Sequence, residues 1–455
     1  MFGVVSFVVL CTPLVSGWHR SHSFKFMGRL FMDATTVRGT PPENGQVRAT
    51  VMMNSFDLKP MSLPEGVVCK FDFGVFAAEC RAEMLTCDVV LPSSLSEVDV
   101  FSMRLEYAGD DPVEDPVEDP EERRLLAGQI PWAFASDGTD RSVSVNVSTW
   151  PLRLPKVRVA HTAMVSPAYI MSCGDNLNND HCFRDWLEWH RSLGVEHFLL
   201  YDNARLNDSA TTKAYFAHTV APYEQIGLVT VVRWPLVLGG NDNNRAQRSQ
   251  LNHALWILSD HTQWIAFFDI DEFFVPPLAA PRPNVKTASW VAQVTRNAPK
   301  LATLLNATIT DPTLAQKVVV KMRNAQHPDA CAPTTPKQTI RLSACNRYHQ
   351  ATMGHPKAFF HFSTISVPPF IRTPHALYST IDYAPQANAF QGRYMHFTRK
   401  YGCKANDTND NSDCMDEVSL QVDPRVSALE ERLTFIDVCE ATVEDTDRML
   451  CYDLD

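Results

Sequence analysis

The sequence lacks the motifs of several common cofactor and metal classes. No Gly-x-Gly-x-x-Gly follows the first strand expected in its α/β region, which disfavours a dinucleotide-dependent oxidoreductase. None of the 12 cysteines has Cys-x-x-Cys spacing, which argues against a structural zinc site. The formal net charge of −11 argues against a nucleic-acid-binding surface. It leaves room for a nucleotide whose charge a metal ion neutralises.

The apolar stretch at the start of the chain is short for a transmembrane helix. It covers residues 1–17, whereas a membrane-spanning helix needs about 20. We expect a cleaved signal peptide, with a short signal-anchor as the alternative, and membrane contact only if the stretch is retained. The many cysteines and the glycosylation sequons fit a secretory chain with disulfides. The spacing of the cysteines does not determine which of them pair. The sequons lie at Asn146, Asn207, Asn306 and Asn406.

Residues 25–155 have the pattern of a β-rich domain. Short strand-like runs such as 47–51, 67–71 and 98–101 are separated by proline and glycine turns. This pattern predicts a β-sandwich-like domain. The acidic, proline-rich repeat within 109–124 predicts a solvated loop inside or at the edge of that domain.

From residue 157 the pattern changes to alternating strands and helices. Helices are expected at 181–192, 210–225 and 245–259. Strands are expected at 168–171, 195–201, 229–232 and 264–268. The alternation predicts an α/β domain with a parallel, Rossmann-like sheet.

Two aspartates directly follow the last of these strands. Asp269 and Asp271 come after the apolar run 264–268, and ligands of such sheets bind beyond the carboxyl ends of the strands. Their oxygens suit Mn²⁺ or Mg²⁺, which substrate diphosphates often share. The alternative is a surface turn after a core strand.

Several segments together resemble glycosyltransferase family 92. They are 182–190, 193–198, 201–203, 245–256, 264–273 and 394–397, and the resemblance covers about residues 160–400. The resemblance implies a GT-A fold and transfer of a sugar, often galactose, from a nucleotide sugar by a Golgi-type, Mn²⁺-dependent enzyme. Plant members carry a β-rich, carbohydrate-binding-like region before the catalytic domain, and residues 25–155 are a candidate for the same role.

The expected organisation is therefore a GT-A catalytic domain preceded by a smaller β-sandwich-like domain. The signal segment is 1–17, the β-rich domain 25–155, the catalytic domain 157–400 and a disulfide-bearing tail 401–455.

The resemblance and the motif positions also suggest ligand-binding residues. His396 best matches the family position of a third metal ligand, with His375 as the competitor. Asp202, at the end of a strand, is a candidate for binding the uracil or ribose. Further candidates for contacts with the nucleotide sugar are Tyr169 and two residues on the helix before strand 264–268, Arg245 and Gln250. For each of them, an ordinary core or surface role is the alternative.

An inverting transferase needs a general base for the acceptor hydroxyl. Asp329 is the first candidate, with Asp311 and Asp382 as alternatives. Glu272 is also a candidate catalytic carboxylate, and its expected role is to orient the two metal-binding aspartates.

The sequence thus favours a lumenal, metal-dependent glycosyltransferase. It would move galactose from a UDP-sugar to a glycan acceptor with inversion, in the Golgi or, alternatively, as a secreted enzyme. The competing hypotheses are an inactive carbohydrate-binding member of the same fold and a nucleotidyltransferase.

Overall fold

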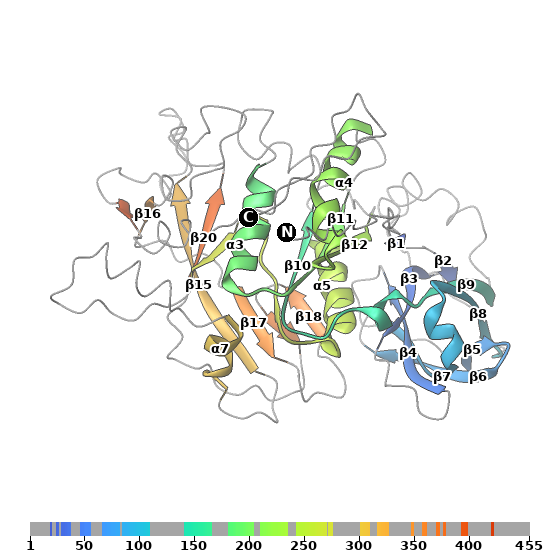
Figure 1. Ribbon diagram of the computed structural model, residues 1–455. Coiled ribbons are helices and arrows are strands. Elements are labelled where there is room, and N and C mark those ends of the chain that lie inside the picture. Colours follow the sequence, from blue (N-terminus) through green and yellow to red (C-terminus); the bar gives the residue numbers. More distant parts are fainter. Residues whose placement is uncertain are drawn as a thin grey trace, which may run out of the picture.

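A computed structural model describes the chain in two strand-rich units joined by a buried contact (Figure 1). The described residues are 19–20, 24–26, 29–37, 46–55, 66–81, 84–109, 141–165, 181–203, 210–234, 243–270, 272–275, 301–309, 316–326, 347–349, 357–361, 370–373, 376–378, 393–398 and 420–422.

The first unit is a closed β-barrel of seven strands. In spatial order they are β3 (Arg29–Val37), β4 (Gln46–Ser55), β7 (Met84–Pro92), β6 (Gly74–Arg81), β5 (Val67–Phe71), β8 (Val100–Tyr107) and β9 (Ser142–Ser148). The ring closes where Thr35 of β3 pairs with Ser148 of β9. The hydroxyl of Thr36 also donates to the Ser148 carbonyl, at 3.2 Å. A short strand, β2 (Phe24–Phe26), pairs with the first three residues of β3.

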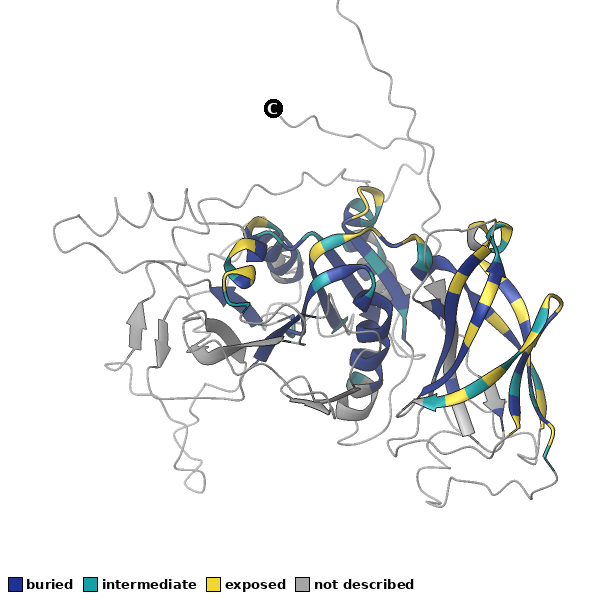
Figure 2. Ribbon diagram, turned by 90° about the horizontal axis from the view of Figure 1, so that it is seen from below, coloured by how far each residue is buried: buried dark blue, intermediate teal, exposed yellow. Residues whose placement is uncertain are grey.

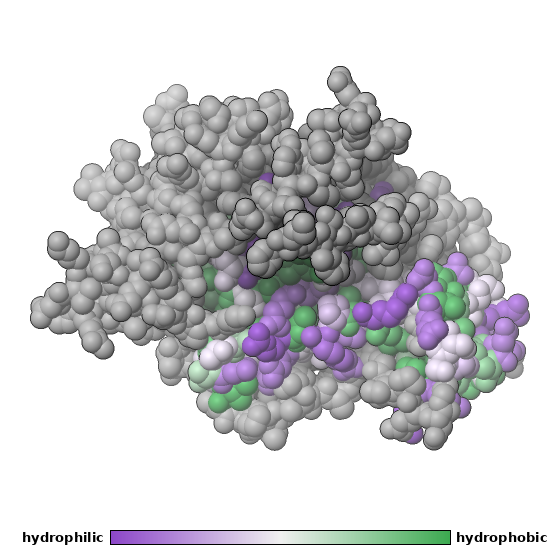
Figure 3. Space-filling view, in the orientation of Figure 1, coloured by the Kyte–Doolittle hydropathy of each residue, from purple (hydrophilic) through white to green (hydrophobic). Residues whose placement is uncertain are grey.

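Alternating side chains explain why these segments form a barrel. Along β8 every second residue is buried, and parts of the other strands show the same alternation in Figure 2, whereas residues 49–53 of β4 and 84–87 of β7 are buried throughout. The inward residues form one apolar core, which includes Val51, Leu85 and Leu105. A disulfide joins Cys69 of β5 to Cys87 of β7, which confirms the prediction of disulfide bonding. In the part of this unit that Figure 3 colours, hydrophilic and hydrophobic residues are interspersed on the surface.

The second unit is built on an 11-stranded mixed sheet. Its parallel part runs β12 (Val229–Arg233), β11 (His197–Asp202), β10 (Val157–Val165) and β13 (Thr262–Ala266). The helices α3 (His181–Leu193), α4 (Ala210–Gln225) and α5 (Asn243–Ser259) connect these strands. The two-residue strand β1 (His19–Arg20) adds to the β12 edge.

Beyond β13 the sheet continues with strands of mixed direction. β17 (Lys357–His361) lies antiparallel to β13, and β15 (Gln316–Gln326) lies antiparallel to β17. β15 then pairs in parallel with β20 (Arg393–Thr398), which pairs antiparallel with β14 (Glu272–Val275). β16 (Arg347–His349) and β21 (Leu420–Val422) complete this side, and β18 (Phe370–Thr373) and β19 (Ala376–Tyr378) form a separate pair.

Three short helices complete the described elements. They are η1 (Ser93–Glu97), η3 (Trp150–Arg153) and α7 (Leu301–Asn306).

The predicted fold class is wrong. We expected an α/β, Rossmann-like GT-A domain behind a β-sandwich, but the described residues form 21 strands and only four α-helices, and the first unit is a closed barrel. The barrel was missed because β9 returns after the acidic repeat to pair with both β8 and β3. The α/β pattern was overextended because strand–helix alternation stops at β13, after which strands of mixed direction follow.

The barrel and the mixed sheet share a hydrophobic cluster. Met52 of β4 and Met84 of β7 pack with Trp150, Leu154 and buried residues of α5. This contact joins the barrel to the helix that precedes β13.

Several sequence-based expectations lie outside the described residues. These are the signal segment 1–17, most of the acidic loop 109–124, the strand expected at 168–171, and the tail 401–455 apart from β21. Among the residues described, no helix is long and apolar enough to cross a membrane. The domain boundaries stay predictions.

Candidate functional site

The site centres on Asp269, which follows the carboxyl end of β13. Trp264 to Phe268 are apolar and buried, whereas 42% of the Asp269 side chain is exposed. Asp269 is therefore a partly exposed carboxylate beyond the carboxyl end of β13, and the chain is buried again from Glu272 to Val275.

The turn after Asp269 is closed by a pair of hydrogen bonds with Glu272. The Asp269 N–H donates to Glu272 Oε2 at 2.8 Å, and the Glu272 N–H donates to the Asp269 carbonyl at 3.0 Å. Glu272 is 2% exposed, so its carboxylate is buried beside this turn. The turn contains Asp271, which itself lies outside the described residues.

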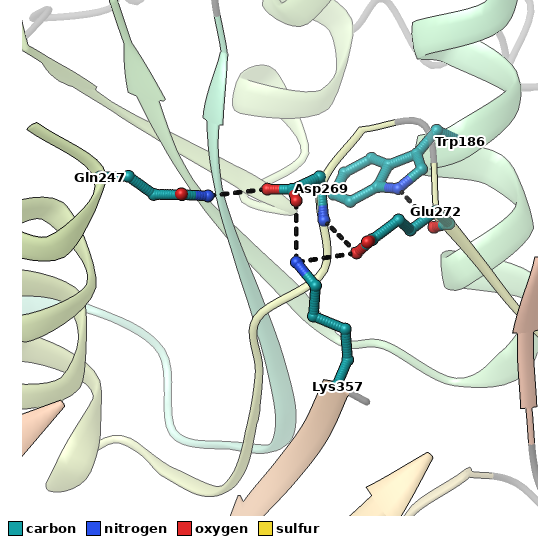
Figure 4. Close-up of polar contacts among 5 residues, drawn as sticks. All are labelled: Trp186, Gln247, Asp269, Glu272 and Lys357. Carbon is teal, nitrogen blue, oxygen red and sulfur yellow. Dashed lines mark hydrogen bonds and ion pairs between the residues drawn. The ribbon is translucent and has the colours of Figure 1, made fainter. Parts of the chain in front are cut away.

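A buried lysine connects the two carboxylates. Lys357, the first residue of β17, places Nζ 2.8 Å from Asp269 Oδ2 and 3.1 Å from Glu272 Oε2 (Figure 4). Burial lowers the pKa of Lys357, but the charges of Asp269 and Glu272 and their hydrogen bonds outweigh it and raise the pKa above its ordinary value. The lysine is therefore a fixed positive charge between two acidic groups.

The second oxygen of Asp269 is held by helix α5. Gln247 Nε2 donates to Asp269 Oδ1 at 2.9 Å, from the side opposite Glu272 in Figure 4. Each carboxylate oxygen thus has a protein donor from a different element, which sets the orientation of the carboxylate.

Strand β14, which follows the turn, is bonded along one edge by side chains of α3. The indole N–H of Trp186 donates to the Glu272 carbonyl at 3.1 Å, and that of Trp189 donates to the Phe274 carbonyl at 2.7 Å. His190 Nε2 accepts from the Phe274 N–H at 3.3 Å. These three residues lie on one face of α3, and they bond to two residues on the same edge of β14. The backbone groups of Glu272 and Phe274 on this edge therefore have hydrogen-bond partners.

Along its other edge, β14 pairs with β20, the strand that carries His396, the predicted third metal ligand. In the β14–β20 pairing Glu272 lies opposite His396, and on the far side of β20 His396 lies opposite Asn324 of β15. The His396 backbone is therefore next to the residue that follows Asp271.

The residues present suit a hard divalent cation. The Asp269 carboxylate is partly exposed, and each oxygen of a carboxylate has two lone pairs, so a hydrogen bond to each still allows an ion to bind. Carboxylate oxygens are the ligands that Mg²⁺ and Mn²⁺ prefer. Within the described part of the chain, no three histidine, cysteine or acidic side chains form a metal-binding group. Asp271 and the His396 side chain are not part of that description.

Of the remaining candidates, the structure describes Asp202 and Gln250 with their side chains, Arg245 by its backbone alone, and the others not at all. Asp202, 2% exposed, ends β11 and lies 3.9 Å from the Arg233 guanidinium, so it is a buried carboxylate near a cation. Gln250 is fully buried and donates to the Thr162 hydroxyl at 2.9 Å, which directs it at β10 rather than at Asp269. Arg245 lies on α5, and only its backbone is described. Outside the described residues are Tyr169, Asp311, Asp329, His375 and Asp382.

Sequence reasoning missed Gln247 and Lys357. Gln247 lies one helical turn before Gln250, so the correct helix was chosen with the wrong residue. Lys357 is separated from Asp269 by 88 positions, and its signal is a charged residue at the start of an otherwise buried strand.

Comparison with known proteins locates a family domain around this site. Residues 169–365 match the sequence model of glycosyltransferase family 92. A glycosyltransferase family 92 protein of Ricinus communis is 26% identical over 108 residues, which are 24% of this chain and 16% of that relative. The chain therefore matches about a sixth of the curated relative's length.

Among solved structures, a ferredoxin–NADP⁺ reductase from Plasmodium falciparum gives a TM-score of 0.11 at 9% identity. It covers 50% of this chain and 76% of the reductase, and at that score it carries no argument about fold or function. The two sequence matches agree with the resemblance expected from the motifs. The segment 169–365, which contains Gln247, Asp269, Glu272 and Lys357, is thus similar to glycosyltransferase family 92.

Proposed function

We propose that this protein is a metal-dependent glycosyltransferase that moves a sugar from a UDP-sugar to a glycan acceptor. The observation that carries the proposal is the position of Asp269, a partly exposed carboxylate at the carboxyl end of a buried strand, held by Gln247 and Lys357 inside the family segment. Galactose is the first donor sugar to test, and we expect inversion at the anomeric carbon.

The proposed metal ligands are Asp269, Asp271 and His396, with His375 as the alternative histidine. A bound Mn²⁺ or Mg²⁺ would supply Lewis-acid stabilisation of the negative charge on the leaving diphosphate. Asp269 has the oxygen chemistry for such an ion, and the pairing of Glu272 with His396 brings the two chain segments together.

The chain's own groups prepare this site in three ways. Gln247 and Lys357 fix the two oxygens of Asp269, so little reorganisation is needed when a cation binds. Glu272 closes the turn that carries Asp271. The indoles of Trp186 and Trp189 hold β14 in place behind that turn.

The acceptor half of the reaction needs a general base, for which Asp329 remains our candidate, with Asp311 and Asp382 behind it. The buried carboxylate of Asp202, one strand away from β10, remains the candidate for binding the nucleoside. We place the enzyme in the secretory pathway, in the Golgi lumen, because its disulfide-bonded barrel and sequons suit that compartment.

The test is turnover of a UDP-sugar panel with Mn²⁺ by the wild type and by Asp269→Asn and Asp271→Ala. We expect one donor to be hydrolysed or transferred, with a loss of at least about a hundredfold in kcat/KM in either variant. Asp99→Asn, a carboxylate with 79% of its side chain exposed on the barrel side, is the matched control and should retain full turnover.

Turnover that survives both substitutions would overturn the proposal. If no donor is turned over by the wild type but glycans bind to it, the carbohydrate-binding hypothesis takes its place. Turnover of nucleoside triphosphates instead of UDP-sugars would favour a nucleotidyltransferase.

A further inference from the structure

Lys357 is a buried cation at a site where a second cation is expected. Its side chain is 4% exposed, and its ammonium lies within 3.1 Å of a carboxylate oxygen of both Asp269 and Glu272. A buried ammonium needs such partners because leaving water is costly for a charge. Two roles would explain it: neutralising Glu272, or positioning Asp269.

The two carboxylates differ in exposure, and therefore in how much each needs the lysine as a counterion. Only 3% of the Glu272 side chain is exposed, so this carboxylate needs a buried counterion. Asp269 is 42% exposed, and water could solvate it without any lysine. The bond from Lys357 to Asp269 is nevertheless the shorter of the two, at 2.8 Å against 3.1 Å.

The bond to Asp269 also complements the bond from Gln247. Lys357 occupies Oδ2 from strand β17, and Gln247 occupies Oδ1 from helix α5. A carboxylate held at both oxygens by separate elements cannot rotate freely about its side-chain bonds. The lone pairs of the Asp269 oxygens therefore keep one direction relative to the turn that carries Asp271.

We infer that Lys357 is a positioning residue that holds the Asp269 carboxylate in the orientation that binds a divalent cation. The inference rests on the proposed function, because it needs a cation at Asp269. It adds a role for β17, a strand that sequence reasoning did not connect with the site. Hydrogen bonds to metal-binding side chains commonly change metal affinity by about 10- to 100-fold when they are lost.

The test uses a double substitution that keeps the local charge constant. Lys357→Met with Glu272→Gln removes one positive and one negative charge, so the electrostatic attraction of the site for a cation is nearly unchanged. The amide oxygen introduced by Glu272→Gln can still accept from the Asp269 N–H and keep the turn closed. Replacing a buried ion pair by neutral residues of similar shape is often tolerated by the fold.

The measurement is Mn²⁺ binding to the full chain by electron paramagnetic resonance, without nucleotide, together with the melting temperature. We expect wild-type protein to bind Mn²⁺ and the double variant to bind at least about tenfold more weakly, with little change in melting temperature. The matched control is Arg158→Met with Glu196→Gln, an ion pair between the start of β10 and the residue before β11, which should leave Mn²⁺ affinity unchanged.

Equal Mn²⁺ affinity in wild type and double variant would overturn the inference and leave Lys357 as the counterion of Glu272, with the proposed function intact. No Mn²⁺ binding by wild type would overturn both. If the double variant does not fold, Lys357→Arg replaces it, since arginine keeps the charge beside Glu272 but carries its donors on a longer, planar group. Weaker Mn²⁺ binding by Lys357→Arg supports positioning, and unchanged binding contradicts it.

Discussion

At the scale of single residues, Asp269 shows how a carboxylate can be both partly exposed and fixed. Its backbone N–H is bonded to Glu272, and its two side-chain oxygens are bonded to Gln247 and Lys357. These partners come from three different parts of the chain, and only Glu272 is close to Asp269 in the sequence. Orientation is therefore set by the tertiary fold rather than by the Asp-x-Asp motif itself.

Gln247→Leu should weaken Mn²⁺ binding by about tenfold, because Asp269 Oδ1 loses its donor while the charge of the site is unchanged. Stability should change little, since Asp269 is partly exposed and can bond to water instead. Calorimetric titration with Mn²⁺ measures the effect, and Gln225→Leu, at an exposed position at the end of α4, is the control. Unchanged affinity in Gln247→Leu would mean that this hydrogen bond does not orient a metal ligand.

At the scale of elements, α3 does more than cover the sheet with an apolar face. Its two indoles and one imidazole bond to the edge of β14 that faces away from β20. The sequence suggested only an amphipathic helix with buried aromatic residues. The polar atoms of those aromatic side chains tie the helix to the strand after the candidate site.

Trp189→Phe should lower the free energy of unfolding by about 1–3 kcal/mol, because the buried Phe274 carbonyl loses its donor. Most of the aromatic packing, including the contact with Phe273, can be kept by phenylalanine. Urea unfolding of wild type and variant measures the difference at equal m-values. An unchanged midpoint would show that the indole hydrogen bond adds nothing to the stability of this unit.

The elements were largely predictable, and their pairing was not. The helices expected at 181–192, 210–225 and 245–259 occur within two residues of those bounds, because apolar periodicity is a local property. The closure of the barrel joins Thr35 to Ser148, and the Lys357–Asp269 bond joins residues 88 positions apart. Such pairings depend on which edges remain free after the local elements form, and no short sequence window contains that information.

At the scale of the whole molecule, the barrel is attached to the sheet through α5. Met52 and Met84 of the barrel pack in the same cluster as Leu251, Leu255 and Leu258 of the helix that carries Gln247. The buried methionines fix the barrel against the side of α5 away from solvent. The candidate site and the barrel thus share one helix as support.

Burial of several histidines should make the whole molecule sensitive to acid. Burial lowers the pKa of His190 to about 3 and the pKa values of His197 and His261 to about 4. An unfolded histidine has a pKa near 6.5, so the unfolded chain binds more protons below that pH. Their contribution to stability is therefore complete above pH 6.5 and is lost as the pH falls towards 4, by about 1.4 kcal/mol per pH unit for each histidine.

Urea unfolding between pH 7.5 and 5 measures this slope. His197→Asn keeps a donor for the Gly227 carbonyl, which His197 Nδ1 contacts at 3.1 Å, but cannot titrate. The variant should therefore lose less stability on acidification than wild type. Identical slopes in the two proteins would show that His197 does not stay neutral in the fold.

The central claim is that Asp269 and Asp271 hold a cation that binds a nucleotide sugar. The most direct measurement is calorimetric binding of UDP to the full chain with Mn²⁺ and with a chelator, for wild type and Asp271→Ala. We predict binding by wild type that needs Mn²⁺ and is weakened at least about tenfold in the variant. UDP binding that is equally tight with chelator, or unchanged in the variant, would contradict the account.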